Sequence, residues 1–230
     1  MKPLSPIYLA GGLAVLLLGG FGLIADEVIE GDTMTVDMAV LMALRRPGNP
    51  TDPIGPAWLP EAARDVTGLG SFSVLGIVVI VVVILLLLTN RARTAWFLAG
   101  SVLLGTVVST VLKTVFDRPR PDLTGVAKVF TASFPSGHAT LSAVVYLTLG
   151  TLLALRAPDR RLKVFYVAVA VFLTVIVGIS RIYLGVHYPT DVLAGWSLGS
   201  AWALLTGMGA YAIGIHAAAK SVPNQGLPNG

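Results

Sequence analysis

The chain has 230 residues, of which 55% are hydrophobic and only 12% are charged. A soluble globular domain carries roughly 25% charged residues, so this chain lacks the charged coat that a soluble fold of its size needs. The absence of cysteine excludes disulfides and thiolate metal sites, and a net charge of +4 without a long basic run argues against nucleic acid as a partner. The composition indicates a protein of the lipid bilayer.

Six apolar stretches are each long enough to cross a membrane as a helix, because about 20 helical residues span the hydrocarbon core. In chain order they are Ile7 to Ala25, Ser71 to Thr89, Thr94 to Leu112, His138 to Leu155, Val164 to Ile179 and Val192 to Ile215. We therefore predict an all-α fold, a six-span transmembrane helix bundle that forms a single domain over residues 1–220. Residues 221–230 are expected to be a disordered tail.

Basic residues in the short connections set the expected orientation. Arg91 and Arg93 follow the second stretch, and several more lie between Arg156 and Lys163 after the fourth. Short cytoplasmic loops are enriched in lysine and arginine, so both connections and both termini are expected on the cytoplasmic side. The sequence thus predicts a multi-pass protein of the cell (inner) membrane.

The connection between the first two spans, residues 26–70, is long and rich in proline and glycine. Residues 36–44 gather their apolar side chains on one helical face, and residues 60–64 suggest a helix opened by proline. We expect two short interfacial helices in this outer loop, separated by an irregular segment at 47–56. The loop either packs at the membrane surface or forms a lid over a site.

Three polar clusters interrupt the apolar second half of the chain. They run from Lys113 to Pro121, from Pro135 to His138 and from Ser180 to Asp191. The first ends the third span, the second begins the fourth, and the third joins the fifth to the sixth. Because the fourth span carries the chain inward and the fifth returns it, the topology brings all three clusters to the outer face.

The clusters contain the groups that suit a phosphoryl group. Lys113, Arg120 and Arg181 are three permanent cations, and guanidinium groups match phosphate oxygens in two-point contacts. Ser136 and Gly137 lead into a helix whose unpaired N–H groups and positive dipole end favour an anion. One such cation alone would be an ordinary interfacial anchor, but together with two histidines they predict a catalytic anion site.

The two histidines have different surroundings, which suggests different roles. Asp191 lies four residues after His187, and a carboxylate that accepts from one ring nitrogen leaves the other free to attack. His187 is therefore the candidate nucleophile. His138 has no such partner and is the candidate general acid. Pro189 disfavours helix before it, which places His187 just ahead of the sixth span and Asp191 in its first turn.

Two further readings concern metals and packing. Two histidines and an aspartate are plausible zinc ligands, but three cations at the same place would repel a divalent ion and hold a phosphate. We expect no metal and no cofactor. Gly195 and Gly199 form a small-residue pair that favours close packing within the chain over dimerisation, while the oligomeric state stays open.

These clusters resemble the signature of the phosphatidic acid phosphatase type 2 superfamily, which reads K-x6-RP, PSGH and SR-x5-H-x3-D. Lys113 with Arg120-Pro121 matches the first part, residues 135–138 match the second, and residues 180–191 match the third. The resemblance implies a helical membrane fold and metal-independent hydrolysis. It also implies roles for single residues: His187 as nucleophile, Asp191 as its orienter, His138 as proton donor, and phosphate contacts from Lys113, Arg120, Ser136, Gly137 and Arg181.

The expected function is hydrolysis of a phosphomonoester or diphosphate on a membrane lipid, through a phosphohistidine, at the outer face of the membrane. Candidate substrates are undecaprenyl diphosphate, phosphatidylglycerophosphate, phosphatidate and lipid A phosphates. Transfer of the phosphate to another lipid and hydrolysis of a sugar phosphate stay open as alternatives. The alternative outside enzymes is a membrane protein that only binds anionic lipids.

Overall fold

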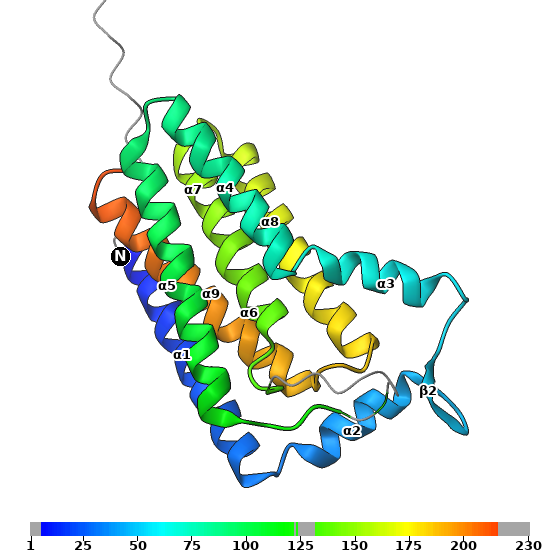
Figure 1. Cartoon of the computed structure of the whole chain (residues 1–230). Helices are drawn as coiled ribbons and strands as arrows, with labels where there is room; N and C mark the ends of the chain where they lie inside the picture. The colour runs from blue at the N-terminus through cyan, green and yellow to red at the C-terminus, as the bar shows by residue number, and fades with distance from the viewer. Residues whose placement is uncertain (1–5, 122, 124–131, 216–230) are drawn as a thin grey trace, which may run out of the picture.

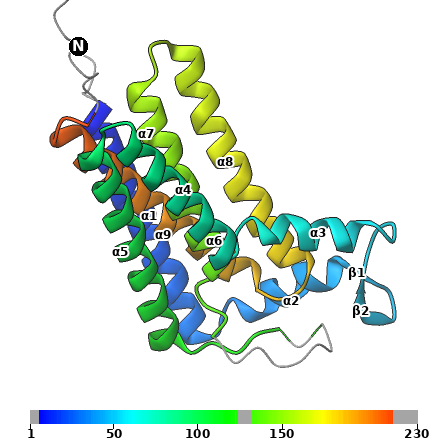
Figure 2. The same ribbon diagram turned by 45° about the horizontal axis from the view of Figure 1, so that its top comes forward.

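The computed structural model describes residues 6–121, 123 and 132–215, and the expected tail at 221–230 lies outside them. Long helices form a bundle from which a shorter segment projects to one side (Figures 1 and 2). The long helices are α1 (Pro6–Glu30), α4 (Phe72–Leu88), α5 (Ala92–Phe116), α8 (Arg160–Tyr183) and α9 (Pro189–Ala212). One further long helix consists of three consecutive parts: α6 (Gly137–Ser142), a π-helical turn η1 (Ala143–Leu147) and α7 (Thr148–Arg156).

The membrane character predicted from composition is confirmed, whereas the number of spans stays a prediction. By length and apolarity, α1, α5, α6 to α7 and α8 can each cross a membrane, and α3 (Leu59–Gly68) with α4, bent by 44°, gives a fifth candidate. Among the described helices, α9 is long enough but is not one of these candidate spans, because small and polar side chains lower its apolarity. Many of them, including Asp191, Gly195 and Thr206, are buried inside the bundle.

The connection after α1 is more ordered than expected. It contains the two anticipated short helices, α2 (Met34–Ala43) and α3, but the segment at 47–56 was wrongly expected to be irregular. There, β1 (Arg45–Arg46) pairs antiparallel with β2 (Asn49–Pro53), so the fold is not purely α. Gly48 adopts a φ of 80° in the turn, and Arg46 lies 3.1 Å from Asp52 across the hairpin. A proline-glycine pair therefore makes a tight turn here.

Close packing of α6 on α9 depends on the glycine pair. A Cβ atom on Gly199 would lie 2.5 Å from the Cβ of Ala143 and 2.6 Å from the carbonyl oxygen of Thr140. A Cβ atom on Gly195 would lie 3.0 Å from both the Cβ of Ala139 and the carbonyl oxygen of Ser136. The pair therefore serves contact within the chain, and it brings the start of α6 onto the first turns of α9.

The end of α5 directs the first polar cluster away from the helix. Asp117 ends α5 in a left-handed conformation with a φ of 41°, and its backbone N–H donates to the carbonyl of Lys113 at 3.3 Å. Pro119 and Pro121 cannot continue a helix ladder. The chain therefore turns across the end of the bundle. There, Arg120 donates to the carbonyl of Val186 between α8 and α9, and Arg118 donates to Asp191 in the first turn of α9.

Candidate active site

The eight predicted site residues lie at one end of the bundle, where the end of α5 and the starts of α6 and α9 meet (Figure 1). Lys113 is in the last turn of α5, Ser136 is the N-cap of α6, and Arg181 is in the last turn of α8. Asp191 is in the first turn of α9, and His187 lies just before that helix. This placement at one end of the bundle is the one that the order of spans and polar clusters in the sequence predicts.

His187 is held through both ring nitrogens. Nη1 of Arg120 lies 3.0 Å from Nε2, and Oδ2 of Asp191 lies 3.3 Å from Nδ1. A guanidinium can only donate, so Nε2 accepts and the ring proton of the neutral imidazole is on Nδ1. This tautomer carries a lone pair on Nε2, the nitrogen that faces the cation cluster. The ring is therefore oriented as a nucleophile requires.

The protonation state of His187 agrees with that role. The side chain is buried, and burial lowers its pKa to about 3 although the hydrogen bond that Nδ1 donates to Asp191 acts in the opposite direction. An imidazole with such a low pKa is neutral near pH 7. Only the neutral ring has a free lone pair with which to attack phosphorus.

Asp191 binds more groups than the sequence indicated. Its Oδ2 accepts from the backbone N–H of Tyr188 at 2.9 Å and from the hydroxyl of Ser133 at 2.5 Å, besides facing His187. Its Oδ1 accepts from Nη1 of Arg118 at 2.7 Å. The carboxylate is completely buried, so these donors replace water around an ionised group.

Sequence reasoning missed Ser133 and Arg118. Arg118 lies inside the first polar cluster, but the spacing gave no reason to separate its role from that of Arg120. Ser133 precedes the second cluster by two residues, and its Oγ also lies 3.3 Å from Nδ1 of His187. Only the fold brings these two side chains to Asp191.

Lys113 reaches the site over the start of α6. Its Nζ donates to the carbonyl of Ala132 at 2.9 Å. A Cβ atom on Gly137 would lie 3.1 Å from Cε of Lys113, so the glycine leaves the space that the lysine stem occupies. Ser136 accepts from the N–H of Ala139 at 3.5 Å as a helix cap, while its own N–H donates to the carbonyl of Asp191 at 2.9 Å.

Arg181 and His138 complete the cluster without a direct hydrogen bond to the other predicted residues. Nη1 of Arg181 donates to the hydroxyl of Thr67 on α3 at 3.1 Å, and its buried Nε has no partner among the described residues. The His138 ring likewise makes no hydrogen bond within the described part of the chain. Lys113, Arg120 and Arg181 are nevertheless close enough to His138 to act on it electrostatically. These cations form the environment that an anion would neutralise.

The end of the connection between α1 and α4 packs against this cluster. The carbonyl of Leu69, at the bend between α3 and α4, accepts from the hydroxyl of Tyr146 at 2.7 Å. A Cβ atom on Gly70 would collide with Val177 and lie 3.4 Å from the carbonyl oxygen of His138. The bend therefore packs directly against the start of α6.

Metal ligands are not grouped in the part of the chain that the structure describes. No three side chains among its histidines, aspartates and glutamates lie together in a way that could hold a metal ion. The charged groups near His138 are cations. This set suits an anionic ligand.

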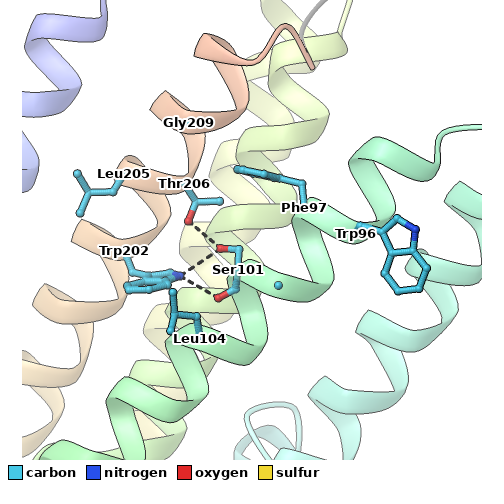
Figure 3. Close-up of a pocket in the computed structure, with 9 residues that line it drawn as sticks. Trp96, Phe97, Ser101, Leu104, Trp202, Leu205, Thr206 and Gly209 are labelled. Atoms are coloured by element: carbon cyan, nitrogen blue, oxygen red, sulfur yellow. Dashed lines mark hydrogen bonds between the residues drawn. The ribbon is translucent and has the colours of Figure 1, made fainter.

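A separate hollow lies between α5 and α9 (Figure 3), and none of the residues that line it is charged. Its volume is about 510 Å³, and Trp96, Phe97, Leu104 and Leu205 contribute its apolar lining. The polar contacts in it connect uncharged groups, such as the hydroxyls of Ser101 and Thr206 at 2.8 Å. It offers no charged group to a phosphate and is not a candidate for the chemistry.

Comparison with known proteins identifies the family. The pattern of the PAP2 superfamily matches residues 94–211, which include all eight predicted site residues. The chain belongs to the PAP2 superfamily. This confirms the family assignment made from the three sequence motifs.

Relatives of this PAP2 protein are named as phosphatases. The chain is 34% identical over 146 residues to phosphatidylglycerophosphatase B of Bacillus subtilis, an alignment that covers 62% of the chain and 70% of the relative. It is 35% identical over 115 residues to decaprenylphosphoryl-5-phosphoribose phosphatase of Mycobacterium tuberculosis, covering 48% of the chain and only 58% of that relative. The predicted enzyme class, phosphatase, is confirmed.

A solved structure shares the fold. The transmembrane PAP2-type phosphatidylglycerolphosphate phosphatase of Bacillus subtilis superposes with a TM-score of 0.75 at 29% identity. The match covers 84% of this chain and 93% of that one. The PAP2 protein described here therefore has the architecture of a transmembrane member of its family.

Replacing His187 with asparagine should remove a source of pH-dependent stability. With a folded pKa of about 3 against an ordinary 6.5, the ring stays neutral in the fold while the unfolded chain takes up a proton below pH 6.5. The associated stability is complete above pH 6.5 and falls by about 1.4 kcal/mol per unit as the pH drops towards 3. Thermal unfolding in detergent between pH 8 and pH 5 measures this. The midpoint of the wild type should fall more steeply than that of His187→Asn, and parallel curves would contradict the buried neutral ring.

Proposed function

We propose that this PAP2 protein removes a phosphate from a phosphomonoester or diphosphate head group of a membrane lipid, through a phosphohistidine formed on His187. The observation that carries the proposal is the neutral His187 ring, bound at Nδ1 by Asp191 and facing Arg120 at Nε2. A protein that only bound anionic lipids would need the cations, but it would have no use for an oriented, neutral imidazole.

In the first step the substrate phosphate enters between the cations and draws Arg120 from Nε2 to its own oxygens. Nε2 of His187 then attacks phosphorus, and the bond from phosphorus to the leaving oxygen breaks. His138 donates a proton to that oxygen. The bound phosphate brings negative charge beside His138, which favours the protonated ring that this step needs. The imidazole becomes positively charged, and Asp191 stabilises that charge at Nδ1.

In the second step water attacks the phosphorus of the phosphohistidine. His138, now neutral, accepts a proton from the water, and the bond from phosphorus to Nε2 breaks. Inorganic phosphate leaves, and both histidines return to their starting states. Lys113, Arg120 and Arg181, with the N-terminal end of α6 at Ser136 and Gly137, stabilise the charge on the equatorial oxygens in both steps.

A lipid substrate follows from the position of the site. The cluster lies where α5 ends and α6 begins, at one end of two helices long enough to cross the bilayer. The phosphate of an amphiphile lies at this level while its tails stay in the hydrocarbon. The names of the relatives, which include phosphatidylglycerophosphatase B, support a lipid phosphate as substrate. Transfer to a second lipid in place of water, or hydrolysis of a sugar phosphate, would use the same first step.

We propose that the site faces the outside of the cell or the periplasm, with both termini in the cytoplasm. Basic connections lie at the other end of the bundle, between α4 and α5 and between α7 and α8 (Figure 1). Arg156 of one connection donates to Thr94, near the other, at 2.8 Å. Clustered short basic loops favour the cytoplasmic side.

The function is tested by phosphate release from a panel of substrates in the presence of EDTA. Detergent-purified protein would be offered phosphatidylglycerophosphate, phosphatidate, undecaprenyl diphosphate and lipid A, with glucose 6-phosphate as the substrate without a lipid tail. At least one lipid should be hydrolysed faster than the sugar phosphate, and His187→Ala should release nothing. Activity lost to EDTA and restored by zinc or magnesium would contradict metal-independent hydrolysis.

Replacing His138 with alanine should affect substrates according to their leaving groups. A lipid alkoxide is a poor leaving group that depends on the proton from His138, so turnover should fall by about 10² to 10⁴-fold. p-Nitrophenolate leaves without that proton, so turnover of p-nitrophenyl phosphate should fall much less at the phosphorylation step. Single-turnover rates with both substrates provide the measurement. Equal losses for the two leaving groups would remove His138 from the role of general acid.

A further inference from the structure

A buried carboxylate outside the region matched by the PAP2 pattern belongs to the same network as Asp191. Asp37 lies on α2, in the connection after the first helix, and its side chain is completely buried. Its Oδ1 accepts from the backbone N–H of Thr190 at 3.0 Å. Its Oδ2 accepts from the hydroxyl of Thr190 at 2.6 Å and from Nη2 of Arg118 at 2.8 Å. A segment far away in the sequence therefore binds the residue next to Asp191.

Arg118 connects the two buried acids. Its Nη2 donates to Asp37, and its Nη1 donates to Asp191 at 2.7 Å. The guanidinium lies over the ring of Tyr188, 4.2 Å from the ring centre, and Thr33 accepts a further hydrogen bond from Nη2 at 3.2 Å. One cation is thus shared between two carboxylates. The two carboxylates are completely buried and Arg118 is almost so, and the group of three keeps one net negative charge there.

That net charge matters for the chemistry at His187. When Nε2 bonds to phosphorus the imidazole ring becomes positive, and the carboxylate at Nδ1 must stabilise it. If Arg118 were paired with Asp191 alone, the two charges would cancel and little attraction for the ring would be left. Asp37 takes up part of the charge of Arg118. The charge of Asp191 then stays available to the nucleophile.

We propose that Asp37 and Arg118 are positioning residues of this enzyme, which together fix Asp191 and set the negative charge that it presents to His187. The inference rests on the proposed phosphohistidine mechanism. Neither residue contacts the phosphate site directly in this arrangement, so their effect should be on the phosphorylation step and not on substrate binding.

The alternative is that Asp37 only anchors α2 to the start of α9. The N–H of Thr190 is in the first turn of α9, where backbone donors have no partner within the helix, and a carboxylate there stabilises the helix end. An anchor of that kind needs the hydrogen bonds but not the charge balance. The two roles therefore predict different values of kcat for a variant changed at both Asp37 and Arg118.

The test is a double-mutant cycle with Asp37→Asn, Arg118→Gln and the double variant. Asp37→Asn leaves Arg118 to neutralise Asp191, and Arg118→Gln leaves two buried carboxylates that repel each other without the cation that holds them. Each single change should lower kcat for p-nitrophenyl phosphate by about 10- to 100-fold with KM within about threefold of the wild type. The double variant restores a single net negative charge, so its kcat should exceed that of both single variants.

Thr33→Val is the matched control, since it removes one hydrogen bond from Arg118 without a change of charge. Its kcat should stay within about threefold of the wild type. Thermal unfolding midpoints of all variants would be measured in the same detergent. If a single variant does not purify as a folded protein, the double variant is compared with Thr33→Val directly. It should then retain kcat within about tenfold of that control.

Two outcomes would overturn the inference. The first is a double variant whose kcat, relative to the wild type, is equal to or below the product of the relative kcat values of the two single variants. Two independent structural defects would give that result. The second is a loss confined to KM. A failure of the proposed function can be distinguished from a failure of this inference. It would appear as a phosphoenzyme that persists in His187→Ala, whatever the result of the double-mutant cycle.

Discussion

The completely buried carboxylate of Asp191 is the group on which the rest of the site depends. An ionised carboxylate away from water is stable only when its oxygens are paired, and here Tyr188, Ser133, His187 and Arg118 supply the pairing. These donors come from three separate segments: the end of α5, the approach to α6 and the start of α9. Keeping Asp191 charged therefore requires that these three segments meet at one point.

The helix bundle makes that meeting possible through its small side chains. Gly195 and Gly199 let α6 lie against α9, so that the backbone N–H of Ser136 reaches the carbonyl of Asp191. Gly137 similarly leaves room for the stem of Lys113. The glycines at these positions have a steric role: they determine where the anion-binding groups stand relative to the nucleophile.

The sequence was informative where local spacing decides geometry, and much less so for contacts between distant segments. The order of spans and clusters was enough to place His187 before the last helix and to gather the cations at one end. Asp37 and Ser133 could not be predicted, because nothing local shows that α2 and the approach to α6 fold onto α9. The hairpin of β1 and β2 was missed because the turn at Pro47 was read only as a breaker. The apolarity of α9 does not decide whether it spans the membrane, because a helix that is surrounded by other helices can carry small and polar side chains.

The proposed mechanism depends on a covalent bond between phosphorus and Nε2 of His187. Rapid acid-free quenching after mixing with a ³²P-labelled lipid phosphate, followed by digestion and mass spectrometry, would measure it. The proposed mechanism predicts acid-labile phosphate on the peptide that contains His187 and none in the His187→Ala variant. Label carried by another residue, or label that persists in the variant, would contradict it.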